Sequence, residues 1–382
     1  MSIEGQLNIL LTINHAKVKC QLSSSRPLQA SQIFIGKPID TVLQTLPMLF
    51  NICGKAQATA TLRAYESIAN KAVDIAIEQQ REALIHLESL REQLWKIILD
   101  WAKYLDEPSD AALLSTLTQL INKISQGINR NKTLLTRSPR LNKTDSFVAD
   151  WQSLKALLEE KILIGKSQQW LSCSPEFIEG LKHQDKQTTR FLVWLAQQVD
   201  FETGASSVKS LMKWDNKQLK QRLDHENYTF TASPDWQGEV QEVSWFSLQT
   251  QHPLVADLLD QYGNSIYTRM VARLVGIADL IKKLDDFFLG SAPALAYKAN
   301  NGMAHINAAR GRLTHRLKMD GDKVKQLNIL APTEWNFHPQ GVVVKSLEGL
   351  QANHVDQLKL QAELLIHAVD PCVGYQLHIN EA

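Results

Sequence analysis

The feature that most limits the fold of this chain is a long segment in which apolar residues recur at helical spacing, from about Ala56 to Leu105. Within it, positions three or four apart form a single stripe, at Leu84, Leu87, Arg91, Leu94, Ile98, Trp101 and Leu105. Such a stripe is the face that a helix buries against its neighbours. Glu107-Pro108-Ser109 ends the pattern, because proline cannot continue a helix. We therefore expect a helical body with this stripe in its core.

The rest of the chain adds helices in its middle and strands near both ends. Helical spacing recurs at 39–50, 111–128, 147–164, 188–199, 208–223, 254–288 and 355–367. Strict alternation from Leu7 to Leu22 predicts a β-hairpin near the N-terminus. Asp320-Gly321 between alternating residues predicts a second hairpin near the C-terminus. Together these patterns predict an α+β protein that is predominantly helical.

The charge balance excludes several classes of partner. The 382 residues include 41 Lys and Arg and 40 Asp and Glu, a net charge of +1, so we expect no overall attraction to nucleic acid or to a membrane surface.

The sequence also shows no membrane-spanning or targeting pattern. No stretch approaches the roughly 18 apolar residues of a transmembrane helix. Met1-Ser2-Ile3-Glu4-Gly5 carries an acid where a signal peptide has basic residues. We expect a cytoplasmic protein with no membrane partner and no nucleic-acid partner.

The cysteines form no CxxC pair and lie far apart, at Cys20, Cys53, Cys173 and Cys372. In a reducing cytoplasm they are expected to be free thiols. Cys20 and Cys173 lie in no motif and are interpreted as core residues. Cys53 and Cys372 belong to the motifs described next.

Five short segments carry chemical information as a set. They are Ile3-Glu4-Gly5; Ile52-Cys53-Gly54; Arg310-Gly311 with His315 and Asp320-Gly321; Pro332-Thr333-Glu334-Trp335-Asn336 with Pro339; and Asp370-Pro371-Cys372 with His378. Their order and spacing resemble the large subunit of nickel–iron hydrogenases, which carries R-I-E-G-H, R-x-C-G-x-C, E-x-P-R-G, P-T-x-W-N-x-x-P and D-P-C-x-x-C-x-x-H motifs. The resemblance runs from Ile3 to His378. It implies the fold of that subunit, a helical core with β-hairpins near the N- and C-termini.

The resemblance also implies a single domain over residues 1–382. We expect residues 1–54 to hold the N-terminal hairpin and the first cysteine motif. Residues 55–290 are expected to form the helical body, with a polar insertion near 226–253. Residues 291–382 are expected to hold the C-terminal β region, the last helix and the second cysteine motif.

The chain lacks part of the metal-ligand set of that family. In the family two CxxC pairs supply four thiolates, and here the second cysteine of each pair is replaced, by Ala56 and by Tyr375. The His after the first motif is replaced by Ala60. Alanine donates no ligand, and a tyrosine oxygen is a harder donor than the soft thiolates that nickel needs in such a site. We therefore expect no nickel and no hydrogen turnover by this chain.

One thiol remains from each end of the chain. Cys53 comes just before the long helical segment, whose N-terminus is expected to lower the pKa of this thiol. Asp370-Pro371-Cys372 has the pattern of a helix start, so residues 372, 375 and 378 are expected on one helix face. If the fold of the family is kept, the two thiols meet in one pocket, enlarged by the two alanines and partly filled by the tyrosine.

This pattern resembles the large-subunit-like maturation proteins of the HupK/HoxV type, which are understood as scaffolds on which an iron dicyano-carbonyl unit is assembled or from which it is passed to the true large subunit. Two thiolates with room beside them are donors for one iron that carries diatomic ligands, so we expect Cys53 and Cys372 to hold the iron. In the family the matching cysteines bind nickel only. The resemblance implies that Arg310 binds the diatomic ligands, since a planar guanidinium suits cyanide nitrogen. Its implied partners are the iron-unit assembly complex, the small chaperone of that pathway and the immature large subunit.

Two other functions stay open from the sequence. One is a degenerate paralogue that binds a hydrogenase subunit without carrying metal. The other is a redox enzyme that uses one metal held by Cys53 and Cys372. The incomplete ligand set argues against the redox enzyme, and the metal-free paralogue stays the alternative to the scaffold.

The other motif residues are interpreted as structural. Glu4 and His378 match family residues near the metal site and near a structural magnesium site, and hydrogen bonding or packing explains them without a metal. His315 is expected to be structural. Trp335 is expected to be a core residue of a buried turn from Pro332 to Pro339.

Overall fold

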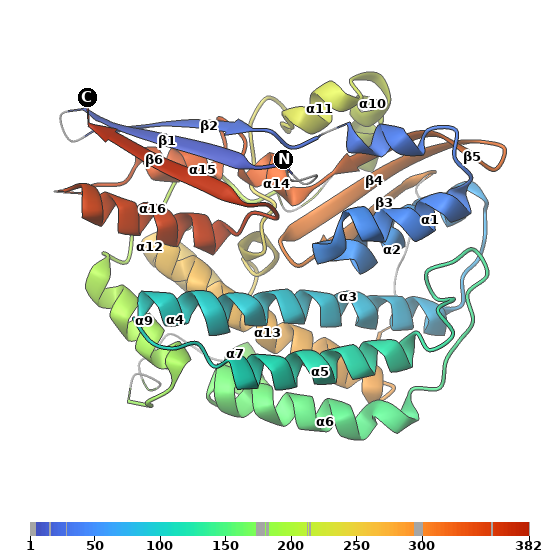
Figure 1. Ribbon diagram of the computed structural model, residues 1–382, viewed down its shortest axis with the longest axis horizontal. Helices are drawn as coiled ribbons and strands as arrows, with labels where there is room; N and C mark the ends of the chain where they lie inside the picture. Colours follow the sequence, from blue (N-terminus) through green and yellow to red (C-terminus); the bar gives the residue numbers. More distant parts are fainter. Residues whose placement is uncertain are drawn as a thin grey trace.

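The computed structural model describes residues 5–14, 17–27, 29–172, 180, 183–211, 213, 215–293, 301–352 and 354–381. Glu4 and Cys173 lie outside the described residues. Helices form one side of the molecule, and two small sheets lie on the other side (Figure 1). This confirms the expected α+β architecture with a predominance of helices.

The described helices are α1 (Ile39–Leu49), α2 (Gly54–Ile68), α3 (Ile75–Trp95), α4 (Trp101–Tyr104), α5 (Ala111–Ile128), α6 (Val148–Leu157), α7 (Ser167–Ser172), α9 (Gln187–Gln198), α10 (Asn216–His225), α11 (Tyr228–Ala232), α12 (Pro253–Tyr262), α13 (Ile266–Phe288), α14 (Pro332–Asn336), α15 (Val342–Glu348) and α16 (Val355–Val369). Two short 3₁₀ segments precede the site, η1 (Ala30–Phe34) and η2 (Asn51–Cys53). A π-helical segment, η3 (Lys96–Asp100), joins α3 to α4.

The described strands are β1 (Leu7–Asn14), β2 (Lys17–Ser24), β3 (Met303–Ala308), β4 (Gly311–Asp320), β5 (Lys323–Leu330) and β6 (Tyr375–Glu381). They form two three-stranded sheets, in the orders β2-β1-β6 and β3-β4-β5. Both expected hairpins are confirmed, since β1 pairs antiparallel with β2 and β4 pairs antiparallel with β5. Gly321, with φ of 57°, lies in the turn between β4 and β5, where glycine adopts this backbone without strain.

β6 pairs with β1 in parallel, with Leu7 opposite Tyr375 and Ile13 opposite Glu381. The first strand of the chain and the last are therefore neighbours in one sheet (Figure 1). This pairing holds the end of the chain beside its beginning.

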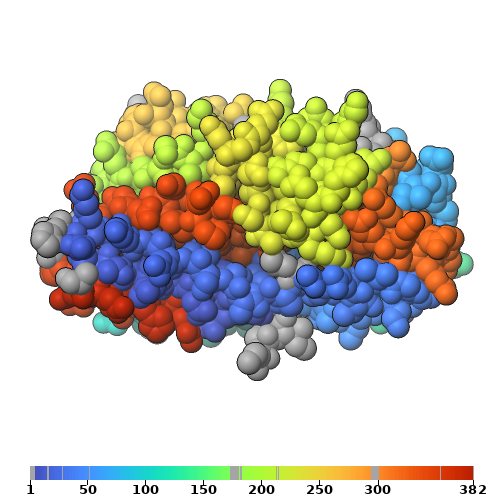
Figure 2. Space-filling model, turned by 90° about the horizontal axis from the view of Figure 1, so that it is seen from above, coloured from blue at the N-terminus to red at the C-terminus, as the bar shows by residue number. Residues whose placement is uncertain are grey.

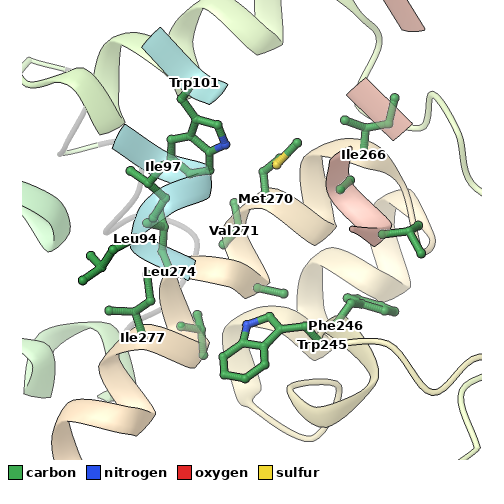
Figure 3. Close-up of a cluster of buried hydrophobic side chains, with 14 of the residues drawn as sticks. Leu94, Ile97, Trp101, Trp245, Phe246, Ile266, Met270, Val271, Leu274 and Ile277 are labelled. Carbon is green, nitrogen blue, oxygen red and sulfur yellow. The ribbon is translucent and has the colours of Figure 1, made fainter. Parts of the chain in front are cut away.

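The predicted apolar stripe lies in the core. Leu84, Leu87, Leu94, Ile98 and Trp101 are buried. Figure 3 shows Leu94, Ile97 and Trp101 facing side chains of α13, among them Met270 and Leu274. α13 is buried over most of its length, and at Gly276 it contacts Trp245 so closely that a Cβ would lie 2.5 Å from the indole nitrogen. Only glycine fits at this contact.

Several boundaries differ from the expectation. The helix expected from Ala56 to Leu105 is divided by a break at residues 69–74 into α2 and α3. The helix expected at 208–223 begins only at Asn216, and the polar segment 226–253 contains α11 and a 3₁₀ turn. The helix expected at 254–288 is divided at Gly263, with φ of 65°, into α12 and α13. In the described part of the chain, no helix is both long and apolar enough to cross a membrane.

Candidate functional site

A cavity of about 500 Å³ lies between α2, the β3-β4-β5 sheet and the segment that follows α16. Cys53, Cys372 and Arg310 all line this cavity. The expectation that one thiol from each end of the chain meets in one pocket is therefore met. Figure 2 shows N-terminal residues (blue) in contact with C-terminal ones (orange and red) across one face of the molecule.

Cys53 is the residue that precedes α2, at the end of η2. The carboxylate of Glu88 on α3 accepts hydrogen bonds from the backbone N–H groups of Lys55 (2.8 Å) and Ala56 (3.1 Å). Glu88 thus occupies the free N–H groups of the first turn of α2, as a capping side chain does. It fixes the turn that carries Cys53.

The expectation that a helix N-terminus lowers the pKa of Cys53 is wrong. Burial raises the pKa of this thiol above its ordinary value, and the neighbouring Cys372 and Glu88 raise it further. Gln57 and Arg310 oppose the shift without reversing it. The low-dielectric surroundings favour the neutral thiol.

Cys372 lies in an irregular segment and not in a helix, which corrects a second expectation. Asp370 ends α16 in the left-handed conformation, with φ of 65°. Residues from Tyr375 onward form strand β6, so 375 and 378 face opposite sides of a sheet. His378 is exposed on that strand, whereas Tyr375 is half-buried.

Ala56 and Ala60 were expected to enlarge the cavity and Tyr375 to fill part of it, and the structure differs at all three positions. Ala56 and Ala60 are fully buried against β3 and β4, in a cluster with Ile306 and Leu313. The hydroxyl of Tyr375 hydrogen-bonds Nε2 of His367 at 3.1 Å. None of the three is among the residues that line the cavity.

Arg310 lies at the turn between β3 and β4, buried beside two carboxylates. Its Nη1 donates to Glu92 at 2.8 Å, and its Nε lies 3.5 Å from the carboxylate of Asp370. Lys96 (3.1 Å) and Arg273 (3.8 Å) also pair with Asp370. Burial opposes the charge of Asp370, but the three cations outweigh it and hold its pKa below the ordinary value. This buried group of charges fixes Arg310 against the segment that carries Cys372.

Two further cavity residues were not singled out in the sequence as site residues. Arg26 forms an ion pair with Glu334 of α14 at 2.7 Å, and burial raises the pKa of Glu334. Glu334 stands inside a recognised motif, which was the one available signal. Nothing in the local pattern around Arg26 indicates that it faces a cavity.

A third such residue is Gln57, whose amide donates a hydrogen bond to the sulfur of Cys53 at 3.5 Å. Gln57 follows Cys53 by four positions on α2, and side chains at this spacing share a helix face.

His315, expected to be structural, is fully buried next to Gln57. Burial lowers the pKa of His315 to about 3. Trp335 is fully buried in the short helix α14, so its expected place in the core is confirmed.

The protein's own donors to a metal are few. In the described part of the chain, no group of three or more His, Cys, Asp or Glu side chains is arranged to hold a metal ion. At the cavity the soft donors are the two sulfurs, with two guanidinium groups in the same wall.

The comparisons with known proteins agree with this architecture. The family profile described as nickel-dependent hydrogenase matches residues 194–378. The structure of a variant of the NiFeSe hydrogenase from Desulfovibrio vulgaris Hildenborough superimposes with a TM-score of 0.69 at 13% identity, over 97% of this chain and 99% of that one. The Ni-Fe-Se hydrogenase from Desulfomicrobium baculatum gives 0.67 at 14% identity, over 95% of each chain. The protein has the fold of the nickel–iron hydrogenase large subunit.

The sequence comparison finds full-length relatives that are named hydrogenase expression/formation proteins. The hydrogenase expression/formation protein HupK of Bradyrhizobium diazoefficiens is 26% identical over 100% of this chain and 99% of its own. The hydrogenase expression/formation protein HoxV of Cupriavidus necator is 27% identical over 94% of this chain and 93% of its own. The chain is therefore similar over nearly its whole length to hydrogenase expression/formation proteins of the HupK/HoxV type, and it has the fold of a hydrogenase large subunit.

Proposed function

We propose that this protein is a scaffold in the maturation of nickel–iron hydrogenase, which holds the iron dicyano-carbonyl unit at Cys53 and Cys372 and passes it to the hydrogenase large subunit. The observation that carries the proposal is the meeting of Cys53, Cys372 and Arg310 in one cavity. The names of the full-length relatives support the broader role in hydrogenase maturation.

The donor set suits a cargo that brings most of its own ligands. An iron atom with two cyanides and one carbon monoxide needs only a few donors from a protein, and thiolates are soft ligands suited to such an iron. Arg310 offers a planar donor to a cyanide nitrogen, and its position is fixed by Glu92 and Asp370. A cavity of about 500 Å³ leaves room for the unit.

The same donor set argues for an accessory role and against catalysis. The positions that carry further thiolates in the hydrogenases hold Ala56, packed in the core, and Tyr375, whose hydroxyl is bonded to His367. Neither side chain reaches the cavity. The partners of the scaffold are the iron-unit assembly complex, the small chaperone of the pathway and the immature large subunit.

Infrared spectroscopy tests the proposal. Protein purified without oxygen from maturation-competent cells is expected to show cyanide and carbonyl stretching bands. Cys53→Ser and Cys372→Ser are expected to lose these bands. The matched control is Cys20→Ser, because Cys20 lies on β2 and is not among the cavity-lining residues.

Each other outcome contradicts part of the proposal. Absence of bands from a protein that still co-purifies with a hydrogenase large subunit would indicate a structural partner without metal. Bands that persist in both serine variants would place the iron elsewhere. Hydrogen uptake by the isolated chain would indicate an enzyme.

A further inference from the structure

A buried chain of hydrogen bonds leads from the sulfur of Cys53 into the protein interior. The side-chain nitrogen of Gln57 lies 3.5 Å from that sulfur. Its side-chain oxygen lies 2.7 Å from Nε2 of His315. Nδ1 of His315 lies 2.8 Å from the hydroxyl of Thr61. The side chains of Gln57, His315 and Thr61 are almost completely buried, with exposed fractions of 2%, 0% and 0%.

The far end of the chain determines its direction. The hydroxyl of Thr61 has one hydrogen-bond partner among the described residues, Nδ1 of His315. A buried hydroxyl proton without an acceptor is costly, so Thr61 donates and Nδ1 of the imidazole accepts. Burial lowers the pKa of His315 to about 3, so the ring is neutral at physiological pH. A neutral ring that accepts at Nδ1 carries its proton on Nε2.

That proton decides which way the amide of Gln57 points. Because Nε2 of His315 donates, the group of Gln57 that faces it is the carbonyl oxygen. The NH₂ group of Gln57 then faces the sulfur of Cys53. An amide in the opposite orientation would place two donors against each other at the ring.

We infer that Gln57 is a built-in hydrogen-bond donor to the Cys53 sulfur, and that His315 and Thr61 are positioning residues that lock its orientation. A fixed donor stabilises a sulfur that carries negative charge, as a metal-bound thiolate does, and hydrogen bonds at a cysteine ligand tune the metal it holds. Within the described residues Cys372 has no such side-chain donor. The two sulfurs of the site are therefore chemically unequal.

The consequence for the iron rests on the proposed function. A hydrogen bond withdraws electron density from a bound thiolate. Loss of this hydrogen bond leaves more electron density on the iron. That density weakens the C–O bond of the carbon monoxide and the C–N bonds of the cyanides. In Gln57→Met, which keeps the length of the side chain and removes the donor, the carbonyl and cyanide bands are expected to remain and to move to lower wavenumber. Thr61→Val, two helical turns from Cys53, is expected to cause a smaller shift in the same direction.

The matched control is Thr59→Val. Thr59 is buried on the same helix, and among the described residues its hydroxyl bonds only the backbone carbonyl of Lys55. This variant is expected to leave the bands in place. Unchanged bands in a folded, loaded Gln57→Met protein, with folding checked by circular dichroism, would overturn the inference.

A second measurement needs no iron and separates this inference from the scaffold proposal. Nitrogen-15 NMR of the isolated protein reports which ring nitrogen of His315 carries the proton. The Nε2–H form is expected in the wild type and in Thr59→Val, and a loss of that preference is expected in Thr61→Val. An Nδ1–H ring in the wild type would refute the inferred orientation of Gln57. Absence of infrared bands together with an Nε2–H ring would refute the scaffold proposal and leave the donor in place.

Discussion

At the scale of single residues, Asp370 connects the segment that carries Cys372 to Arg310 and to the helical body. Its carboxylate pairs with Lys96, Arg273 and Arg310 from three separate parts of the chain. Its left-handed backbone turns the chain out of α16 toward Cys372. Asparagine tolerates the same backbone conformation, so a substitution can remove the charge alone.

Asp370→Asn is expected to lower the free energy of unfolding by about 3 kcal/mol, because it leaves buried cations without their shared carboxylate. Urea unfolding followed by fluorescence measures the change. The control is Asp257→Asn, at an exposed position on α12, which is expected to change stability by less than about 0.5 kcal/mol. Equal stability of Asp370→Asn and wild type would show that the pairs with Asp370 contribute nothing net.

At the scale of elements, the first turn of α2 depends on a side chain from α3. Glu88 is buried and accepts from two backbone N–H groups of that turn. Burial raises the pKa of Glu88 to about 7, and the two backbone hydrogen bonds only partly offset this. The native carboxyl therefore keeps its proton to higher pH than the unfolded one.

This shift has a defined effect on stability. Between pH of about 4.5 and 7 the folded protein binds more protons at Glu88 than the unfolded protein, so stability falls as pH rises through this range. Relative to Glu88→Gln, the wild type is expected to lose at most about 3 kcal/mol between pH 5 and pH 8. Urea midpoints at the two pH values measure this difference. The control is Glu202→Gln at an exposed position. A difference between wild type and Glu88→Gln that stays constant with pH would contradict the prediction.

Both hairpins could be predicted from local patterns, and strand β6 was missed because the residues before it favour a helix start. Alternation from Leu7 and the Asp320-Gly321 turn identified both hairpins. Asp370-Pro371 was interpreted as a helix start because aspartate and proline favour that position. Asp370 instead follows a helix, and the alternation of Tyr375, Leu377 and Ile379 belongs to a strand. Their pairing with β1 is a contact between distant parts of the chain, which no local pattern encodes.

At the scale of the whole molecule, the parallel pair of β1 and β6 brings the second cysteine motif back to the first. The meeting of Cys53 and Cys372 was expected from the resemblance to the hydrogenase large subunit, whose fold, if kept, brings the two cysteine motifs together. The sequence did not predict Gln57, Arg26 or Glu334 in the cavity wall. Which side chains share a cavity depends on tertiary packing, and short-range spacing does not record it.

Chemical crosslinking tests this arrangement. Dibromobimane, a bifunctional thiol reagent, is expected to join Cys53 to Cys372 in the native protein, because both thiols line one cavity. In urea the link is expected to disappear. Peptide mass spectrometry identifies the joined residues, and Cys372→Ser is the negative control. A native link from Cys53 to Cys20 instead would contradict the fold at this site.

The alignment of β1 with β6 also sets an order of events during synthesis. Translation releases Cys53 early, and Cys372 only after the whole helical body has been made. β6 can pair with β1 only after all the residues between the two strands have been synthesised. A nascent chain that has not yet been extended to β6 therefore has only one of the two sulfurs that line the cavity.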